Sequence, residues 1–351
     1  KTDFQMINPL LAKWDTPFET PPFDLIAVDH FKPAVDEAIN AARSEISLIT
    51  ENTDPPTFFN TVEPLERSGE QLGRIASVLF NLNNAETSKE LQAAAQEISP
   101  LLTRFSNDIT LNRKLFERIK TVYDSKADAG LNTEQLLLLD KKYRGFILGG
   151  AGLEEDKRQR FREISEELSS ISLKFEENVL EETNGWELHI TDSGDLAGLP
   201  EGLAEAASKE ASAKNKSGWI FTLHYPSYIP FMQYSGKREL REKMLKAYSA
   251  RAFRGNDQDN RELVKRIVNL RLELAQMLGF GNYADMILAD RMAENREKVA
   301  KFLEDLFISS HPAALRDYDQ IKRYADSLGH TGPLERWDWA YYSEKLRKEK
   351  Y

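Results

Sequence analysis

Apolar residues recur every three or four positions over most of this sequence, a spacing that places them on one side of a helix. The pattern is longest between Glu154 and Glu182, and a second run extends from Leu263 to Leu278. Shorter amphipathic segments lie at 35–49, 58–82, 91–109, 115–123, 136–147 and 299–307. Polar links containing Pro, Asn or Gly separate them. The sequence therefore predicts a mainly α-helical protein whose antiparallel helices are joined by short links.

One region departs from this pattern and predicts a small β insertion near 186–224. Residues 186–190 and 219–224 alternate with period two, as expected for two short strands with one buried face. A small helix is predicted between them, over 203–213. Residues 225–230 are predicted to form an irregular aromatic turn, because Pro226 and Pro230 disfavour helix just before them.

These elements predict three domains: a helical lobe at 1–183, the β insertion with its aromatic turn at 184–235, and a helical region at 236–351 that begins a further domain. The chain begins at Lys1 rather than at methionine, and it ends in a charged, helix-like run at 345–351 without Gly, Asn or Pro. Helices usually end at or just before Gly, Asn or Pro. We therefore expect both ends to be cut points in a longer protein.

Composition narrows the possible classes of site and partner. The 351 residues are 41% hydrophobic and contain no run of apolar residues long enough to span a membrane. The net charge of −10 argues against the basic face of a nucleic-acid binder. We therefore expect neither a membrane nor a nucleic-acid partner. The absence of cysteine excludes disulfides, Cys-ligated zinc, iron–sulfur clusters and a thiol nucleophile.

The histidines are few and scattered, at His30, His189, His224, His311 and His330. No His-x-x-x-His pair offers two imidazoles on one helix face. If the two predicted strands pair, Glu187, His189 and His224 can approach one another and bind a metal or transfer protons. The favoured interpretation of these residues is the solvated face of a strand, and His30 is interpreted as a turn or helix-start residue.

Other clusters are also interpreted as structural. Gly149-Gly150-Ala151-Gly152 lacks the Gly-Lys-Ser/Thr ending of a phosphate loop and is interpreted as a turn between helices. Tyr225, Tyr228 and Tyr234 offer phenols that suit either a peptide-binding surface or a core. Four acidic doublets on the long helical segment are interpreted as its solvated face, since adjacent helical residues point apart: 154–155, 166–167, 176–177 and 181–182.

Several motifs occur in one order along nearly the whole chain. They are Asn8-Pro9-Leu10-Leu11, Pro21-Pro22-Phe23-Asp24, His30-Phe31-Lys32-Pro33-Ala34, Asn178-Val179-Leu180 with Trp186, Gly198-Leu199-Pro200, Ala247-Tyr248 with Arg241, Arg251 and Asn260, the runs 270–275, 278–284 and 291–293, and Trp337-Asp338-Trp339-Ala340-Tyr341-Tyr342. In this order they resemble the thimet oligopeptidase, oligopeptidase A and peptidyl-dipeptidase Dcp family of zinc metallopeptidases, with the bacterial peptidyl-dipeptidases as the nearest branch.

This resemblance implies a multi-helical N-terminal lobe of a two-lobed clamshell, zinc as the cofactor and short peptides as substrates, with release of C-terminal dipeptides in the Dcp type. In that family two histidines of a His-Glu-x-x-His helix and a later glutamate hold the zinc. This sequence contains no His-Glu-x-x-His. We therefore assign no catalytic, metal-binding or substrate-binding residue to this chain, and expect no zinc in it.

Two hypotheses follow from the sequence. In the first, the chain is the N-terminal part of a peptidyl-dipeptidase or oligopeptidase, shapes the substrate channel, is inactive alone, has its own missing catalytic lobe as partner and self-associates when isolated. In the second, it is a stand-alone, non-catalytic helical module that binds peptides. Both a cytoplasmic and a periplasmic bacterial location are compatible with the sequence.

Overall fold

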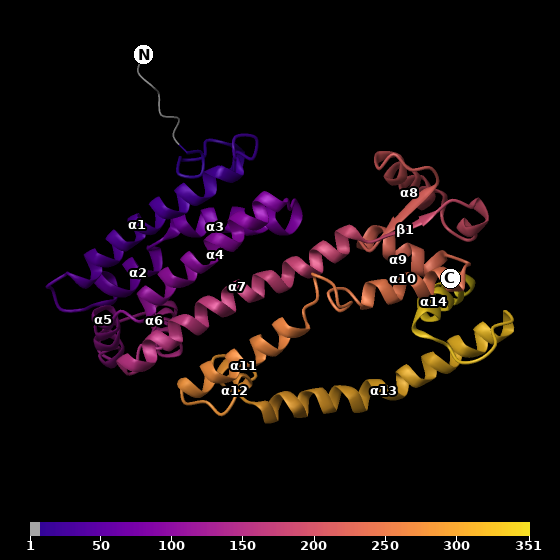
Figure 1. Ribbon diagram of the computed structural model, residues 1–351. Coiled ribbons are helices and arrows are strands. Elements are labelled where there is room, and N and C mark those ends of the chain that lie inside the picture. Colours follow the sequence, from indigo (N-terminus) through magenta and orange to yellow (C-terminus); the bar gives the residue numbers. More distant parts are fainter. Residues whose placement is uncertain (1–7) are drawn as a thin grey trace, which may run out of the picture. The chain divides into compact units, whose positions relative to one another are not determined.

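The computed structural model describes residues 8–351, so the first seven residues of the predicted 1–183 lobe lie outside the described residues (Figure 1). The structure is mainly α-helical with one small sheet, as predicted. The helices are α1 (Phe31–Thr50), α2 (Glu63–Arg67), α3 (Glu70–Ala85), α4 (Lys89–Thr110), α5 (Arg113–Asp124), α6 (Thr133–Leu148), α7 (Glu155–Gly185), α8 (Glu201–Ala213), α9 (Tyr225–Tyr234), α10 (Arg238–Ser249), α11 (Arg261–Met277), α12 (Tyr283–Leu288), α13 (Arg296–Ser327) and α14 (Arg336–Lys350), and the strands are β1 (Glu187–Ile190) and β2 (Trp219–Thr222).

The chain divides into two compact units. Unit 1 comprises Lys1–Lys174 and Leu263–Glu294, and unit 2 comprises Phe175–Glu262 and Asn295–Tyr351. Helix α7 therefore contributes its first part to unit 1 and its last turns to unit 2. The three domain ranges stated from the sequence stay predictions.

The largest core of unit 1 lies among α1, α3 and α4 (Figure 1). Helix α1 contributes Ala34, Val35 and Ala38, which recur at helical spacing on one face and are almost fully buried. Leu10 and Trp14 from the N-terminal segment close the end of this core. Small alanines on α1 allow the neighbouring helices to approach closely.

A second part of unit 1 joins the first turns of α7 to α11. Leu111, Leu153 and Phe161 form a small core onto which Leu274 and Leu278 pack. Arg160 donates two hydrogen bonds to the Glu273 carboxylate, at 2.6 and 2.8 Å. These contacts explain how residues more than a hundred positions apart in the sequence belong to one unit.

The Gly149–Gly152 segment is a turn between α6 and α7, as predicted. Close packing explains the glycine at 149, because a Cβ there would lie 2.7 Å from Thr110 Cβ. Gly150 has a φ of +87°, a conformation that glycine adopts without strain. Packing accounts for Gly149 and backbone conformation for Gly150, so neither needs a bound phosphate to explain it.

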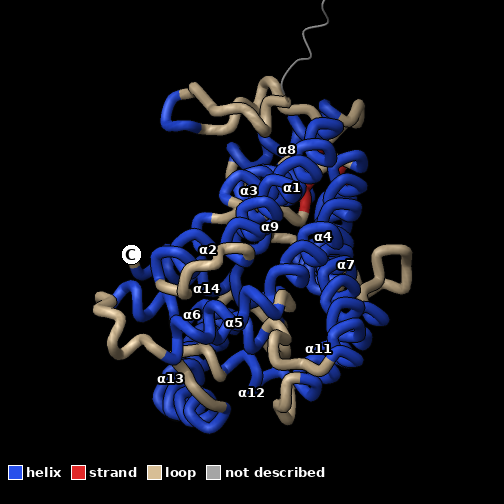
Figure 2. The backbone as a smooth tube through the Cα atoms, turned by 90° about the vertical axis from the view of Figure 1, so that its left-hand side faces the viewer, coloured by secondary structure: helices blue, strands red, loops and turns tan. Residues whose placement is uncertain are grey.

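Unit 2 contains the predicted β insertion as an antiparallel pair, seen in red in Figure 2. Glu187 pairs with Thr222 and Ile190 with Trp219. Leu188, Ile190 and Phe221 are buried in a core that also contains Ala207 of α8 and Met244 of α10. The helix predicted at 203–213 is confirmed as α8.

The predicted aromatic turn at 225–230 is wrong, because these residues begin helix α9. Pro226 occupies the first turn of α9, where its missing N–H has no helical partner to lose. Pro230 removes one interior hydrogen bond. Burial of Tyr228, Phe231 and Met232 in the unit 2 core favours the helix despite that loss.

Two other predicted helices differ in extent. The segment predicted at 58–82 is divided at Ser68 and Gly69, since Gly69 has a φ of +73° and starts α3 in a new direction. Helix α13 extends far beyond the predicted 299–307, to Ser327, with Pro312 inside it. Within residues 8–351, no helix combines the length and the apolar character needed to cross a membrane.

Candidate functional site

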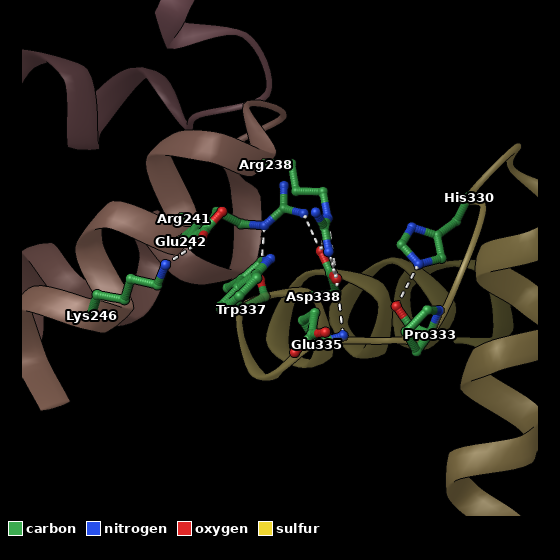
Figure 3. Close-up of polar contacts among 9 residues, drawn as sticks. All are labelled: Arg238, Arg241, Glu242, Lys246, His330, Pro333, Glu335, Trp337 and Asp338. Carbon is green, nitrogen blue, oxygen red and sulfur yellow. Dashed lines mark hydrogen bonds and ion pairs between the residues drawn. The ribbon is translucent and has the colours of Figure 1, made fainter.

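An arginine and an aspartate in unit 2 are almost completely withdrawn from water. The side chain of Arg241 on α10 is 2% exposed, and that of Asp338 on α14 is 0% exposed. Arg241 Nη2 donates to Asp338 Oδ1 at 3.1 Å, and its Nε donates to the Trp337 carbonyl at 2.9 Å (Figure 3). Its Nη1 donates to the Ser235 carbonyl at 2.7 Å. A buried charge requires such complete pairing, because its desolvation is costly.

The Asp338 carboxylate accepts hydrogen bonds from three residues: Arg238, Arg241 and Glu335. Arg238 binds its carboxylate through Nε at 2.9 Å and Nη2 at 2.8 Å (Figure 3). The amide of Glu335 donates to Asp338 Oδ2 at 3.1 Å, which closes the first turn of α14. Arg238 and Arg241 are three residues apart on α10 and so face the same side. One carboxylate thus joins α10 to the start of α14.

The two charges have opposite responses to burial. Burial alone would raise the pKa of Asp338, but hydrogen bonds from Arg238, the Glu335 amide and Arg241 hold that pKa below its usual value. Burial lowers the pKa of Arg241, and Asp338 partly offsets the effect. The Asp338 carboxylate stays ionised and hydrogen-bonded to Arg238 and Arg241. The Asp338–Arg241 pair therefore serves as a structural anchor rather than as a proton donor or base.

Aromatic rings enclose this anchor. Arg241 Cζ lies 4.1 Å from the ring centroid of Tyr341, and Arg238 Cζ lies 5.5 Å from that of Trp337. The rings of His330 and Tyr342 meet edge to face at 5.4 Å. These residues belong to the Trp337–Tyr342 motif or lie beside it, so the motif's role in this structure is to hold α14 in place.

A second polar cluster in unit 2 connects the last turns of α7 to the segment before α11. Asn178 Nδ2 donates to Asn260 Oδ1 at 2.8 Å, and Asn260 Nδ2 donates to the Phe175 carbonyl at 3.0 Å. Arg251 Nη1 donates to Thr183 Oγ1 at 2.9 Å. Asn178, Arg251 and Asn260 are all motif residues, so the motifs in this region also carry structural contacts.

The prediction that the acidic doublets form a solvated face is wrong for one residue in each of the last two doublets, while Glu176 and Glu181 are exposed as predicted. Glu177 and Glu182 are buried. Arg254 Nε lies 3.1 Å from Glu182 Oε2, and Asn256 donates to Glu182 Oε1. Nothing in the local sequence indicates that Glu182 is buried, because its partners Arg254 and Asn256 lie more than seventy positions away. By contrast, Glu166 is partnered by the exposed Arg104.

The structure places the predicted histidines singly. His30 Nδ1 accepts from the Ala27 amide at 3.1 Å just before α1, which agrees with a helix-start role. His189 Nε2 lies 2.6 Å from the Ser217 carbonyl, and the Glu187 carboxylate binds Lys214 and Lys216. The hydrogen bond from Lys216 lowers the pKa of Glu187. Among residues 8–351, no group of three or more histidine or carboxylate side chains is arranged to hold a metal ion.

The three tyrosines have different environments. Tyr228 is buried and stacks on Tyr248 with centroids 4.2 Å apart, and burial raises its pKa. Tyr234 donates to Glu344 Oε1 at 2.7 Å, while Tyr225 is exposed. Of the two sequence interpretations, core packing therefore describes Tyr228, and Tyr234 helps to fasten α9 to α14.

Comparisons with known proteins match nearly the whole chain. The family model "Neurolysin/Thimet oligopeptidase, N-terminal domain" matches residues 35–158, and "Peptidase family M3" matches residues 231–351. Oligopeptidase A of Escherichia coli is 39% identical over 99% of this chain. Dipeptidyl carboxypeptidase of Escherichia coli is 32% identical over 98%, and the organellar oligopeptidase A of Arabidopsis thaliana is 33% identical over 98%.

These identities favour oligopeptidase A over dipeptidyl carboxypeptidase, so they do not support the finer expectation that the peptidyl-dipeptidases are the nearest branch. The chain spans about half the length of the curated relatives it matches, with 51% of each of the two Escherichia coli proteins covered. Two family models in the expected order, together with relatives aligned almost from end to end of this chain, lead to one conclusion. The chain belongs to peptidase family M3, the family of the thimet oligopeptidases and oligopeptidase A.

Proposed function

We propose that this chain is the N-terminal part of a zinc-dependent oligopeptidase that hydrolyses short peptides. The observation that carries the proposal is the alignment of 98–99% of this chain with proteins named oligopeptidase A and dipeptidyl carboxypeptidase. The higher identity to oligopeptidase A favours an oligopeptidase over a dipeptidyl carboxypeptidase as the working model.

The donor groups of this chain do not fit the family's zinc ion. The sequence contains no His-Glu-x-x-His, and the described residues contain no cluster of three or more potential ligands. Three protein ligands and an open position are what a catalytic zinc requires. We therefore assign no step of peptide hydrolysis to residues of this chain, and propose that the ligands lie in the part of the relatives beyond the match.

The proposed role of this chain is to support and enclose the catalytic part. Asp338 joins α10 to α14 through two arginines, and Glu344 accepts from Tyr234 of α9. These contacts fix the direction of α14, the helix closest to the C-terminal end of the chain. Such rigid support is what a catalytic centre built on the following polypeptide needs.

Helix α13 supports the proposal that this chain packs against further polypeptide. Its apolar residues form a stripe that is buried at Ile321 and Ala325, beside α14, and exposed toward the N-terminus of the helix. Phe302, Leu303 and Phe307 are 63%, 59% and 59% exposed. An exposed patch of this kind marks an interaction site. We propose that the missing part of the enzyme covers it.

The proposal is tested by translating the gene beyond Tyr351 and purifying the longer product. We expect a His-Glu-x-x-His helix, about one zinc per chain and hydrolysis of a quenched fluorescent peptide of about ten residues. Replacing the glutamate of that motif by glutamine should remove hydrolysis but leave zinc bound. A stop codon directly after Tyr351, together with tight peptide binding by the chain alone, would support the stand-alone module instead.

A further inference from the structure

A groove in unit 1 lies between the N-terminal segment and α3, and it has the size of a small-molecule site. Trp14, Pro21 and Phe23 form one wall, and Arg74, Val78 and Leu82 belong to the facing side of α3. The volume is about 710 Å³, within the range of about 300–1,000 Å³ typical of ligand pockets. Residues 74, 78 and 82 are four apart, so α3 presents them on one face.

The wall opposite α3 is held in place by hydrogen bonds. Trp14 Nε1 donates to the Pro9 carbonyl at 2.9 Å, which fixes the indole. Gln71 of α3 donates to the Leu11 carbonyl at 2.9 Å, so the segment is tied to the helix next to the groove. The groove is therefore formed before any ligand binds, which lowers the entropic cost of binding.

Arg74 is a half-buried cation that lacks an anionic partner within the described residues. Its Cζ lies 4.2 Å from the Trp14 ring centroid, and Nη2 makes one long contact of 3.5 Å with the Ala12 carbonyl. Most other arginines in unit 1, such as Arg160 and Arg162, bind carboxylates. Among the described residues, no acidic side chain lines the groove.

The lining thus combines one cation with aromatic and aliphatic walls. The guanidinium group of an arginine binds a carboxylate through two parallel hydrogen bonds. Aromatic side chains in the wall of a groove favour a ligand with an aromatic ring that stacks on them. Phe23 remains 57% exposed and is available to cover a ligand. We propose that this groove binds a small organic carboxylate with an aromatic body, with Arg74 paired to the carboxylate and the ring between Trp14, Phe23 and α3. This inference does not rest on the proposed function.

Gly73 offers a way to block the groove without changing its charge. It lines the groove, and a Cβ added there meets nothing within 4 Å. Gly73→Leu therefore places a side chain in the groove at a helical position where leucine is favoured over glycine. Gly73→Ala is the matched control, because it makes the same helix-stabilising change without filling the space.

The test is a titration of the whole chain with N-acetyl-L-phenylalanine, followed by calorimetry or by NMR. We expect one saturable site for the acid. The uncharged analogue N-acetyl-L-phenylalaninamide should bind with a dissociation constant about tenfold or more higher. Arg74→Gln and Gly73→Leu should each weaken binding of the acid by about tenfold or more, whereas Gly73→Ala should not. Arg43→Gln is the control for arginine loss, since Arg43 also lies over an aromatic ring, that of Phe105, but is paired with Asp108.

Three results would overturn the inference. They are equal binding of the acid and the amide, binding that survives both Arg74→Gln and Gly73→Leu, and the absence of saturable binding by the acid. Thermal unfolding of each variant accompanies the titrations. If Arg74→Gln fails to fold, the Gly73→Leu and Gly73→Ala pair decides the question. A dimer that Gly73→Leu dissociates would also overturn the inference, because a second copy of the chain would then occupy the groove.

Discussion

The carboxylate of Asp338 lies 3.1 Å from Arg241 Nη2 and 2.8 Å from Arg238 Nη2, in a position with no exposure to water. Two cations from α10 therefore meet one anion at the start of α14. The buried Arg241 guanidinium also donates hydrogen bonds to the backbone carbonyls of Trp337 and Ser235, which carry no charge. The stability of unit 2 should depend strongly on this one carboxylate.

Asp338→Asn should lower the free energy of unfolding by about 3 kcal/mol or more, because it leaves the buried Arg241 without a counter-charge. Urea unfolding followed by circular dichroism measures this loss. The control is Glu242→Gln, which breaks the exposed pair between Glu242 and Lys246 on α10 and should cost about 0.5 kcal/mol or less. Similar losses for the two variants would contradict the anchoring role.

Acid should weaken the contacts of α14. The hydrogen bond from Arg347, then that from Tyr234, lowers the pKa of Glu344 from 4.5 to about 2. A carboxylate with a lowered pKa stabilises the fold above its unfolded pKa, and that contribution disappears as the pH falls through the folded value. The free energy of unfolding should therefore decrease between about pH 4.5 and pH 2, and Glu344→Gln should flatten that decrease. An unchanged pH profile in Glu344→Gln would show that the carboxylate does not contribute.

The glycines at the end of α6 should respond oppositely to alanine. Gly149→Ala places a Cβ 2.7 Å from Thr110 Cβ and should destabilise the protein by about 1–3 kcal/mol. Gly145→Ala meets nothing within 4 Å and should stabilise it by about 0.4–1 kcal/mol, since alanine restricts the unfolded chain. Thermal melting distinguishes the two. A tolerated alanine at 149 would mean that the turn is less tightly packed than the structure indicates.

The exposed stripe on α13 should make the isolated chain self-associate. Replacing both Phe302 and Phe307 by glutamate should shift the chain toward monomer in light scattering across a concentration series, because each charge disfavours burial of the stripe. Lys301→Gln, whose exposed side chain lies on the side of the helix away from Phe302 and Phe307, should leave the association unchanged. A wild-type chain that stays monomeric at all concentrations would argue against an uncovered interface.

Much of the helical fold follows from periodicity, but its exceptions have definite physical causes. The pattern from Glu154 to Glu182 predicted α7 to within a few residues of its observed ends, Glu155 and Gly185. The aromatic turn was wrong because local proline chemistry was outweighed by burial of Tyr228 and Phe231. Long-range packing of this kind leaves no signal within the segment itself.

The buried polar clusters were the least predictable part. Glu182 has the same local sequence surroundings as solvated glutamates, and only its distant partners Arg254 and Asn256 explain its burial. Asp338 was visible as part of a family motif, yet nothing in the sequence indicated that it pairs with Arg238 and Arg241. Pairings between side chains about seventy to a hundred residues apart require the structure.

The most direct test of the proposed function compares hydrolysis of a quenched fluorescent peptide by this chain alone and by the longer gene product, both supplied with zinc. The account predicts no turnover by residues 1–351 and chelator-sensitive turnover by the longer product, because the zinc ligands are proposed to lie beyond this chain. Zinc-dependent hydrolysis by residues 1–351 alone would contradict it.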